Sequence, residues 1–97
     1  GVGIDEYQEI AVDYKVYPNP TADILFVELY SDENIDLFVE LYNIKGKRLD
    51  GFYKHLSVFG SLKEEFNLGS LPSGNYFLRF NNEEGQAYES IKVQKID

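Results

Sequence analysis

The 97-residue sequence has no cysteine, methionine or tryptophan, and it has a single histidine. Without cysteine the chain can form neither a disulfide nor a thiolate metal site, so packing of apolar side chains has to stabilise it. A zinc site would need His55 plus several carboxylates, which is an unusual ligand set. Because a translation product begins with methionine, we expect this chain to be a processed piece of a longer protein.

Long hydrophobic runs are also missing, and the charge is mostly of one sign. No stretch of eighteen apolar residues and no basic-then-apolar leader occurs, so the sequence indicates neither a membrane-spanning helix nor a signal peptide. The net charge is −8, and the whole excess lies in residues 1–36, whereas acids and bases balance over residues 37–97. An acidic chain repels phosphates, so we expect no nucleic-acid partner and no insertion into a membrane.

What the sequence does contain is aromatic residues and alternation. Eight tyrosines and seven phenylalanines can fill the core of a small sheet protein. Apolar and other residues alternate over short segments separated by Gly, Pro and Asn, and no helical period is present. The pattern predicts an all-β fold, an antiparallel immunoglobulin-like β-sandwich of about seven strands. The expected strands are 14–17, 24–30, 37–44, 52–59, 64–68, 75–80 and 88–95.

Three phrases interrupt the alternation in a fixed order. The first, Tyr17-Pro18-Asn19-Pro20-Thr21, has two prolines that cannot donate to a ladder, so it should run along a sheet edge. The second runs over residues 41–47, LYNIKGK, and its Gly46 predicts a tight hairpin turn. The third runs over residues 71–80, LPSGNYFLRF, where Pro72 and Gly74 make a corner and Tyr76 begins a strand.

This ordered set resembles the C-terminal sorting domain that Bacteroidetes attach to proteins exported by the type nine (Por) secretion system. The family has a "YPNP" opening, a "YDxxGK" hairpin and an "LPxGxYxxR" strand entry. The matching positions here are Tyr17, Pro18, Asn19, Pro20, Gly46, Pro72, Gly74 and Tyr76. The resemblance covers nearly the whole chain, and the final Asp97 departs from it because members more often end on or near a basic residue.

The resemblance implies a non-catalytic module without a cofactor. It would direct an N-terminal cargo domain from the periplasm across the outer membrane, to the medium or to the cell surface, by binding the outer-membrane secretion machinery. The family's signal is a glycine-led hairpin and an alternating basic strand, matched here by Gly85, Ile91, Lys92, Val93 and Lys95. We expect the edge groups and outward cations of this last strand to be read by a receptor.

The domain boundary follows from composition. Residues 1–13 are acidic with scattered apolar residues and are expected to be a tether, and residues 14–97 are expected to form the sorting domain. In the family the module is commonly cut off, and the cargo is then released or joined to a surface lipopolysaccharide. A cut would fall in the tether before Tyr17.

Other functions are open. A sandwich on a secreted protein can be a carbohydrate-binding or adhesion module, and an exposed row of Tyr30, Tyr42, Tyr53 or Tyr88 would favour that function. The acidic stretch 32–36 could hold calcium, although it lacks the ligand spacing of a dedicated loop. An enzyme is not expected, because His55 has no nucleophile or acid–base set around it in the sequence.

Overall fold

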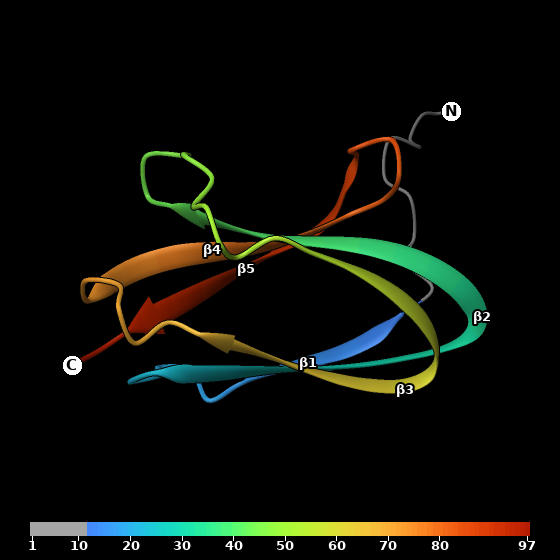
Figure 1. Ribbon diagram of the computed structural model, residues 1–97, viewed down its shortest axis with the longest axis horizontal. Helices are drawn as coiled ribbons and strands as arrows, with labels where there is room; N and C mark the ends of the chain where they lie inside the picture. The colour runs from blue at the N-terminus through green and yellow to red at the C-terminus, as the bar shows by residue number, and fades with distance from the viewer. Residues whose placement is uncertain (1–11) are drawn as a thin grey trace, which may run out of the picture.

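The structure, a computed structural model, describes residues 12–97 and is built of strands (Figure 1). All neighbouring strands are antiparallel, and β2 lies at the centre of the sheet, between β1 and β4 on one side and β3 on the other. The predicted all-β antiparallel class is confirmed. The five strands are β1 (Asp13–Tyr17), β2 (Ile24–Asn43), β3 (Lys54–Asn67), β4 (Gly74–Asn81) and β5 (Ala87–Lys95).

The prediction of about seven strands is wrong in number. The polar stretch 31–36 and the Gly60-Ser61 pair do not separate strands but lie inside β2 and β3, which pair on both sides of these stretches, over residues 24–31 and 35–39 of β2. The register shifts between Ser31 and Ile35, where the chain forms a bulge, and bulges bend a strand without ending it. The immunoglobulin-like arrangement of seven strands is therefore not confirmed.

Both long strands bend sharply, so that a single sheet curls into two facing layers (Figure 1). The lower layer of the figure consists of β1 and the paired segments 24–31 and 60–67. The upper layer consists of the paired segments 35–43 and 54–58, followed by β4 and β5. Ser31 stabilises the bulge through its Oγ, which donates to the Glu33 carbonyl (2.8 Å) and accepts from the Glu33 N–H (3.1 Å).

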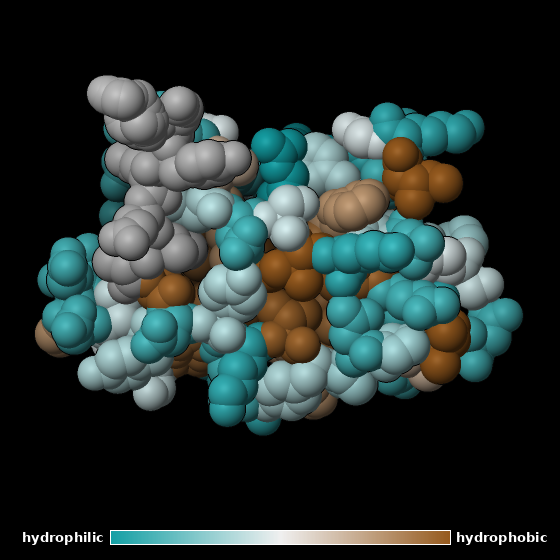
Figure 2. All heavy atoms as spheres, turned by 180° about the vertical axis from the view of Figure 1, so that it is seen from behind, coloured by the Kyte–Doolittle hydropathy of each residue, from teal (hydrophilic) through white to brown (hydrophobic). Residues whose placement is uncertain are grey.

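The core lies between the layers because the alternation keeps the same face of the sheet inward on both sides of the bulge. On β2, Leu25 and Val27 before the bulge and Leu37 and Val39 after it are all fully buried. Seen from behind, hydrophobic atoms also reach the surface in patches framed by polar side chains (Figure 2). The buried apolar residues are Val12, Leu25, Val27, Leu29, Leu37, Val39, Leu41, Leu56, Val58, Phe66, Leu68, Tyr76, Leu78, Phe80 and Val93.

The predicted tether falls almost entirely outside the described residues. Of residues 1–13, the structure describes Val12, which is buried, and Asp13, which begins β1. β1 pairs with β2 from Asp13 to Tyr17, so the residues directly before Pro18 belong to a strand. The expected cut can therefore not fall within β1 without removing a paired strand from the sheet.

Candidate functional site

The predicted recognition strand, β5, pairs with β4 and places alternate side chains on opposite faces. Val93 is fully buried in the core and Ile91 packs against it, while Lys92 is exposed. Lys95 has the same parity as Val93, and only 4% of it is exposed. Its interpretation as an outward cation is wrong, and its Nζ donates to the Ile96 carbonyl at 3.1 Å.

The outer edge of β5 is not free along its final residues. Beyond β1, residues 19–21 run beside β5, where the Thr21 N–H donates to the Gln94 carbonyl and the Ile96 N–H donates to the Thr21 carbonyl, both at 2.9 Å. The Asn19 side chain extends this pairing like a peptide group, because its Nδ2 donates to the Lys92 carbonyl (2.8 Å) and its Oδ1 accepts from the Gln94 N–H (2.9 Å).

We call residues 18–21, Pro18 to Thr21, the strap. Pro18 and Pro20 have no N–H, so the strap pairs with β5 without offering a further ladder on its own outer side. The prediction that this phrase runs along a sheet edge is confirmed, and the edge is that of β5. The outward backbone groups of β5 from Lys92 to Ile96 are therefore already paired, and the expectation that a receptor reads this strand stays a prediction.

Gly46 and Gly85 occupy the same position in two nearly identical hairpin turns. In each turn an asparagine starts the loop and accepts two backbone N–H bonds on its Oδ1, at 2.9 and 3.0 Å for Asn43 and at 3.0 and 2.9 Å for Asn82. The glycine three residues later has φ of +82° or +84°. A side chain is strained at such φ values, so the geometry accounts for both glycines in the motifs.

The corner before β4 explains the third phrase. Gly74 has φ of +150°, and Tyr76 turns inward, where it is 6% exposed. Its hydroxyl donates to the Pro72 carbonyl at 2.6 Å and so closes the corner against the core. Proline, glycine and tyrosine thus have packing and backbone roles here.

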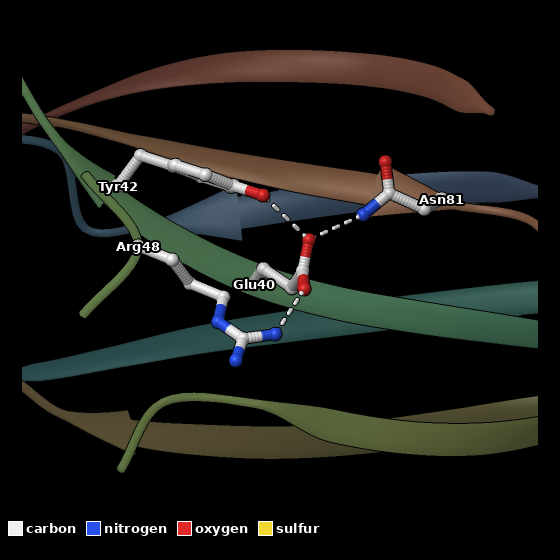
Figure 3. Close-up of polar contacts among 4 residues, drawn as sticks. All are labelled: Glu40, Tyr42, Arg48 and Asn81. Carbon is white, nitrogen blue, oxygen red and sulfur yellow. Dashed lines mark hydrogen bonds and ion pairs between the residues drawn. The ribbon is translucent and has the colours of Figure 1, made fainter. Parts of the chain in front are cut away.

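A polar cluster that sequence reasoning missed lies on the outer face of the upper layer (Figure 3). Glu40 of β2 accepts hydrogen bonds from Tyr42 (2.8 Å) and Asn81 of β4 (2.8 Å) on Oε1, and it forms an ion pair with Arg48 (2.9 Å) on Oε2. Burial alone would raise the pKa of Glu40, but these hydrogen bonds outweigh it and hold the pKa below its ordinary value of 4.5. The alternation along β2 could have indicated this cluster, because it places the Glu40 carboxylate on the outward face between the rings of Phe38 and Tyr42.

Several outward aromatic rings have a cation over one face. The Arg79 guanidinium lies 5.0 Å from the Tyr42 ring centroid, Lys63 Nζ lies 4.7 Å from that of Phe26, and Arg48 lies 5.9 Å from that of Tyr53. Stacking of a sugar needs a free ring face, and each of these cations occupies one face of its ring.

The four tyrosines whose exposed row would favour a carbohydrate-binding module do not form one. Tyr30 and Tyr42 lie on opposite sides of the β2 bulge and so belong to different layers, and Tyr88 packs against the core. The arrangement favours the sorting function over sugar binding.

Residues with catalytic or metal-binding potential do not converge. Half of the His55 side chain is exposed; it pairs with Asp36 (3.0 Å) and stacks on Phe38 (4.4 Å between centroids). Hydrogen bonds from His55 and Ser57, together with a contact to Glu83, lower the pKa of Asp36. Among residues 12–97 no group of three or more His, Asp or Glu side chains is placed to hold a metal, the acidic stretch 32–36 included. The same part of the chain contains no helix that could span a membrane.

Within residues 12–97 the domain is built of strands, and its sequence motifs serve hairpin turns, a corner and the strap. A family profile described as a secretion system C-terminal sorting domain matches residues 15–94. The chain belongs to this family, which supplies the C-terminal sorting signal of type nine secretion in Bacteroidetes. No curated protein matches the chain.

Proposed function

We propose that the domain is cargo-bound at its N-terminal side and passes its cargo from the periplasm through the outer membrane by binding the secretion machinery directly. The match of residues 15–94 to the sorting family carries this proposal. The chain acts without catalysis, and the cargo is exported to the medium or the cell surface. The tether of residues 1–13 joins the domain to the cargo, and a cut that releases the domain lies before β1.

The signal itself comprises the hairpin turn between β4 and β5 and the strand β5. Its residues are Gly85, Ile91, Lys92, Val93 and Lys95. Gly85 shapes the hairpin, Ile91, Val93 and Lys95 hold β5 against the core, and Lys92 faces solvent. Only Lys92 and the hairpin of this set are therefore presented to a receptor directly. The inward residues support recognition by fixing the strand in place.

One side-chain contact supports an immunoglobulin-like fold. A tyrosine near the start of a strand, with its hydroxyl bonded to a backbone carbonyl a few residues upstream, is a recurrent feature of such sandwiches. Tyr76 and Pro72 have this relation, at 2.6 Å.

The proposal is tested by fusing the 97-residue chain to a periplasm-directed reporter and measuring the reporter outside the cell. We expect export in a host with the Por system and retention in the periplasm when that system is deleted. Retention in both hosts, with the fusion folded, would contradict the function.

Gly85 and Gly60 offer a matched pair for the signal itself. Both have positive φ, and an added Cβ would meet no atom within 4 Å at either site, so alanine should cost similar stability at the two sites. If the hairpin turn between β4 and β5 is part of the signal, Gly85→Ala lowers export and Gly60→Ala does not. Equal export of both variants would remove this hairpin from the signal.

A further inference from the structure

The outer face of the upper layer brings together cations from motifs that lie far apart in the sequence. The exposed residues Lys45, Lys47 and Arg48 come from the turn after β2, the exposed Lys92 comes from β5, and the half-buried Arg79 comes from β4. The pairing places Tyr42 opposite Phe77 and Phe77 opposite Lys92, so these elements share one surface. We call this surface, with its five basic residues, the cationic face.

Most cations of this face form no ion pair within the part of the chain that the structure describes. Among residues 12–97 the structure has three ion pairs, and only Arg48 of the cationic face takes part in one, with Glu40. Glu40 lies opposite Arg79 and pairs with Arg48, Asp50 lies near Arg48, and Glu83 lines a pocket together with Glu40, so this face has five basic and three acidic residues. Such a local excess contrasts with the net charge of −8 of the chain.

The cationic face also has an apolar floor. A groove of about 330 Å³ runs between the turn and β5, and Tyr42, Ile44, Phe77 and Ala87 line it together with Arg79. Ile44 is 69% exposed at its rim. Arginine and tyrosine around an apolar centre are typical of protein interfaces, whereas attraction to a phosphate-bearing surface needs cations alone and is opposed by the overall charge.

We propose that the cationic face is the docking surface for an acidic segment of a protein of the secretion machinery. The inference rests on the proposed function and deepens it by naming the contact surface and the chemistry of the partner. Apolar side chains of the segment enter the groove beside Ile44 and Phe77, and its carboxylates pair with Arg79, Lys92 and the lysines of the turn. Recognition thus extends from β5 to the turn of the second motif.

The test uses the reporter fusion in the Por-competent host, with a photo-crosslinking amino acid in place of Ile44. The matched control carries it in place of Phe59, which is 68% exposed in β3 near the bend. We expect a crosslink to a protein component of the machinery at position 44, with a yield about tenfold above that at position 59. Equal yields, or an adduct with lipopolysaccharide alone, would overturn the inference.

Charge variants provide a second readout. We expect Arg79→Gln and Lys92→Glu each to reduce the crosslink at position 44 by about tenfold, the scale of one lost charge contact in an interface. Lys63→Glu is the control, because Lys63 also lies over an aromatic ring but in the other layer. Lys92 is exposed and has no side-chain partner among residues 12–97, so its variant should fold, which its thermal melt checks.

The outcomes separate the two proposals. A fusion that stays in the periplasm without any substitution contradicts the proposed function, and the inference with it. Normal export that neither Arg79→Gln nor Lys92→Glu impairs, or that Lys63→Glu impairs equally, contradicts the cationic face alone.

Discussion

At the scale of single residues, asparagine side chains make hydrogen bonds that backbone groups usually make. Asn43 and Asn82 each gather two N–H groups in a hairpin turn, and Asn19 pairs with β5 as a missing peptide would. Turn chemistry makes the first two predictable, because Asn followed three residues later by Gly is a local signal. The partner of Asn19 lies 75 residues away, and no local pattern indicates it.

Asn19→Ala should remove both side-chain bonds to β5. Hydrogen bonds of this kind contribute about 1 kcal/mol each, less where water competes, so we expect the free energy of unfolding to fall by about 1 to 2 kcal/mol. Urea denaturation measures this loss. Asn75→Ala, at an exposed asparagine of β4, is the control and should change stability by less than about 0.5 kcal/mol. A similar loss in both variants would contradict the role of the strap.

The Glu40 carboxylate makes the free energy of unfolding depend on pH. Its pKa in the folded state lies below the ordinary 4.5, so it stabilises the fold above that pH, and the contribution is lost as the pH falls through the lowered pKa. We expect the stability of the unsubstituted chain to decline below about pH 4.5 more steeply than that of Glu40→Gln. Denaturation curves between pH 3 and 7 test this, and parallel declines would contradict it.

At the scale of elements, the alternation predicts which face of each strand is buried but not where a strand ends. The buried residues of β2 and β4 alternate as the sequence pattern requires, and the same rule, applied to β5, turns Lys95 inward with Ile91 and Val93. The stretch 31–36 has the composition of a turn, yet β2 continues through it. Pairing with β3 outweighs the local preference, and a single sequence does not display that pairing.

The bend offers a prediction at this scale. Gly60 lies opposite Ser31 with φ of +81°, and an added Cβ would meet no atom within 4 Å. Gly60→Ala should therefore destabilise the domain through backbone strain alone, by about 1 kcal/mol. Chemical denaturation measures the change, and Ser61→Ala next to it should have a smaller effect. Unchanged stability of Gly60→Ala would show that the bend tolerates a side chain.

At the scale of the whole molecule, the core has no disulfide to support it. A chain of 97 residues has a total stability of about 5 to 15 kcal/mol, so a single cavity takes a large share of it. Leu78 in β4 is fully buried between the layers. We expect Leu78→Ala to cost about 2 to 5 kcal/mol and to lower the thermal midpoint strongly, as calorimetry would show.

The matching control for the core is Phe77→Ala, on the outward side of the same strand. It should cost less stability than Leu78→Ala, because Phe77 is only partly buried. The reverse order would contradict the assignment of the inward face.

The strap couples the folding of the two ends of the domain. Thr21 and Lys95 bridge the opening motif to the last strand, so β5 has its final geometry only when the residues just after β1 are seated. Secretion machinery that bound β5 only in this geometry would discriminate between a folded domain and an unfolded one. The sorting domain would then be recognised only after its own sheet is complete.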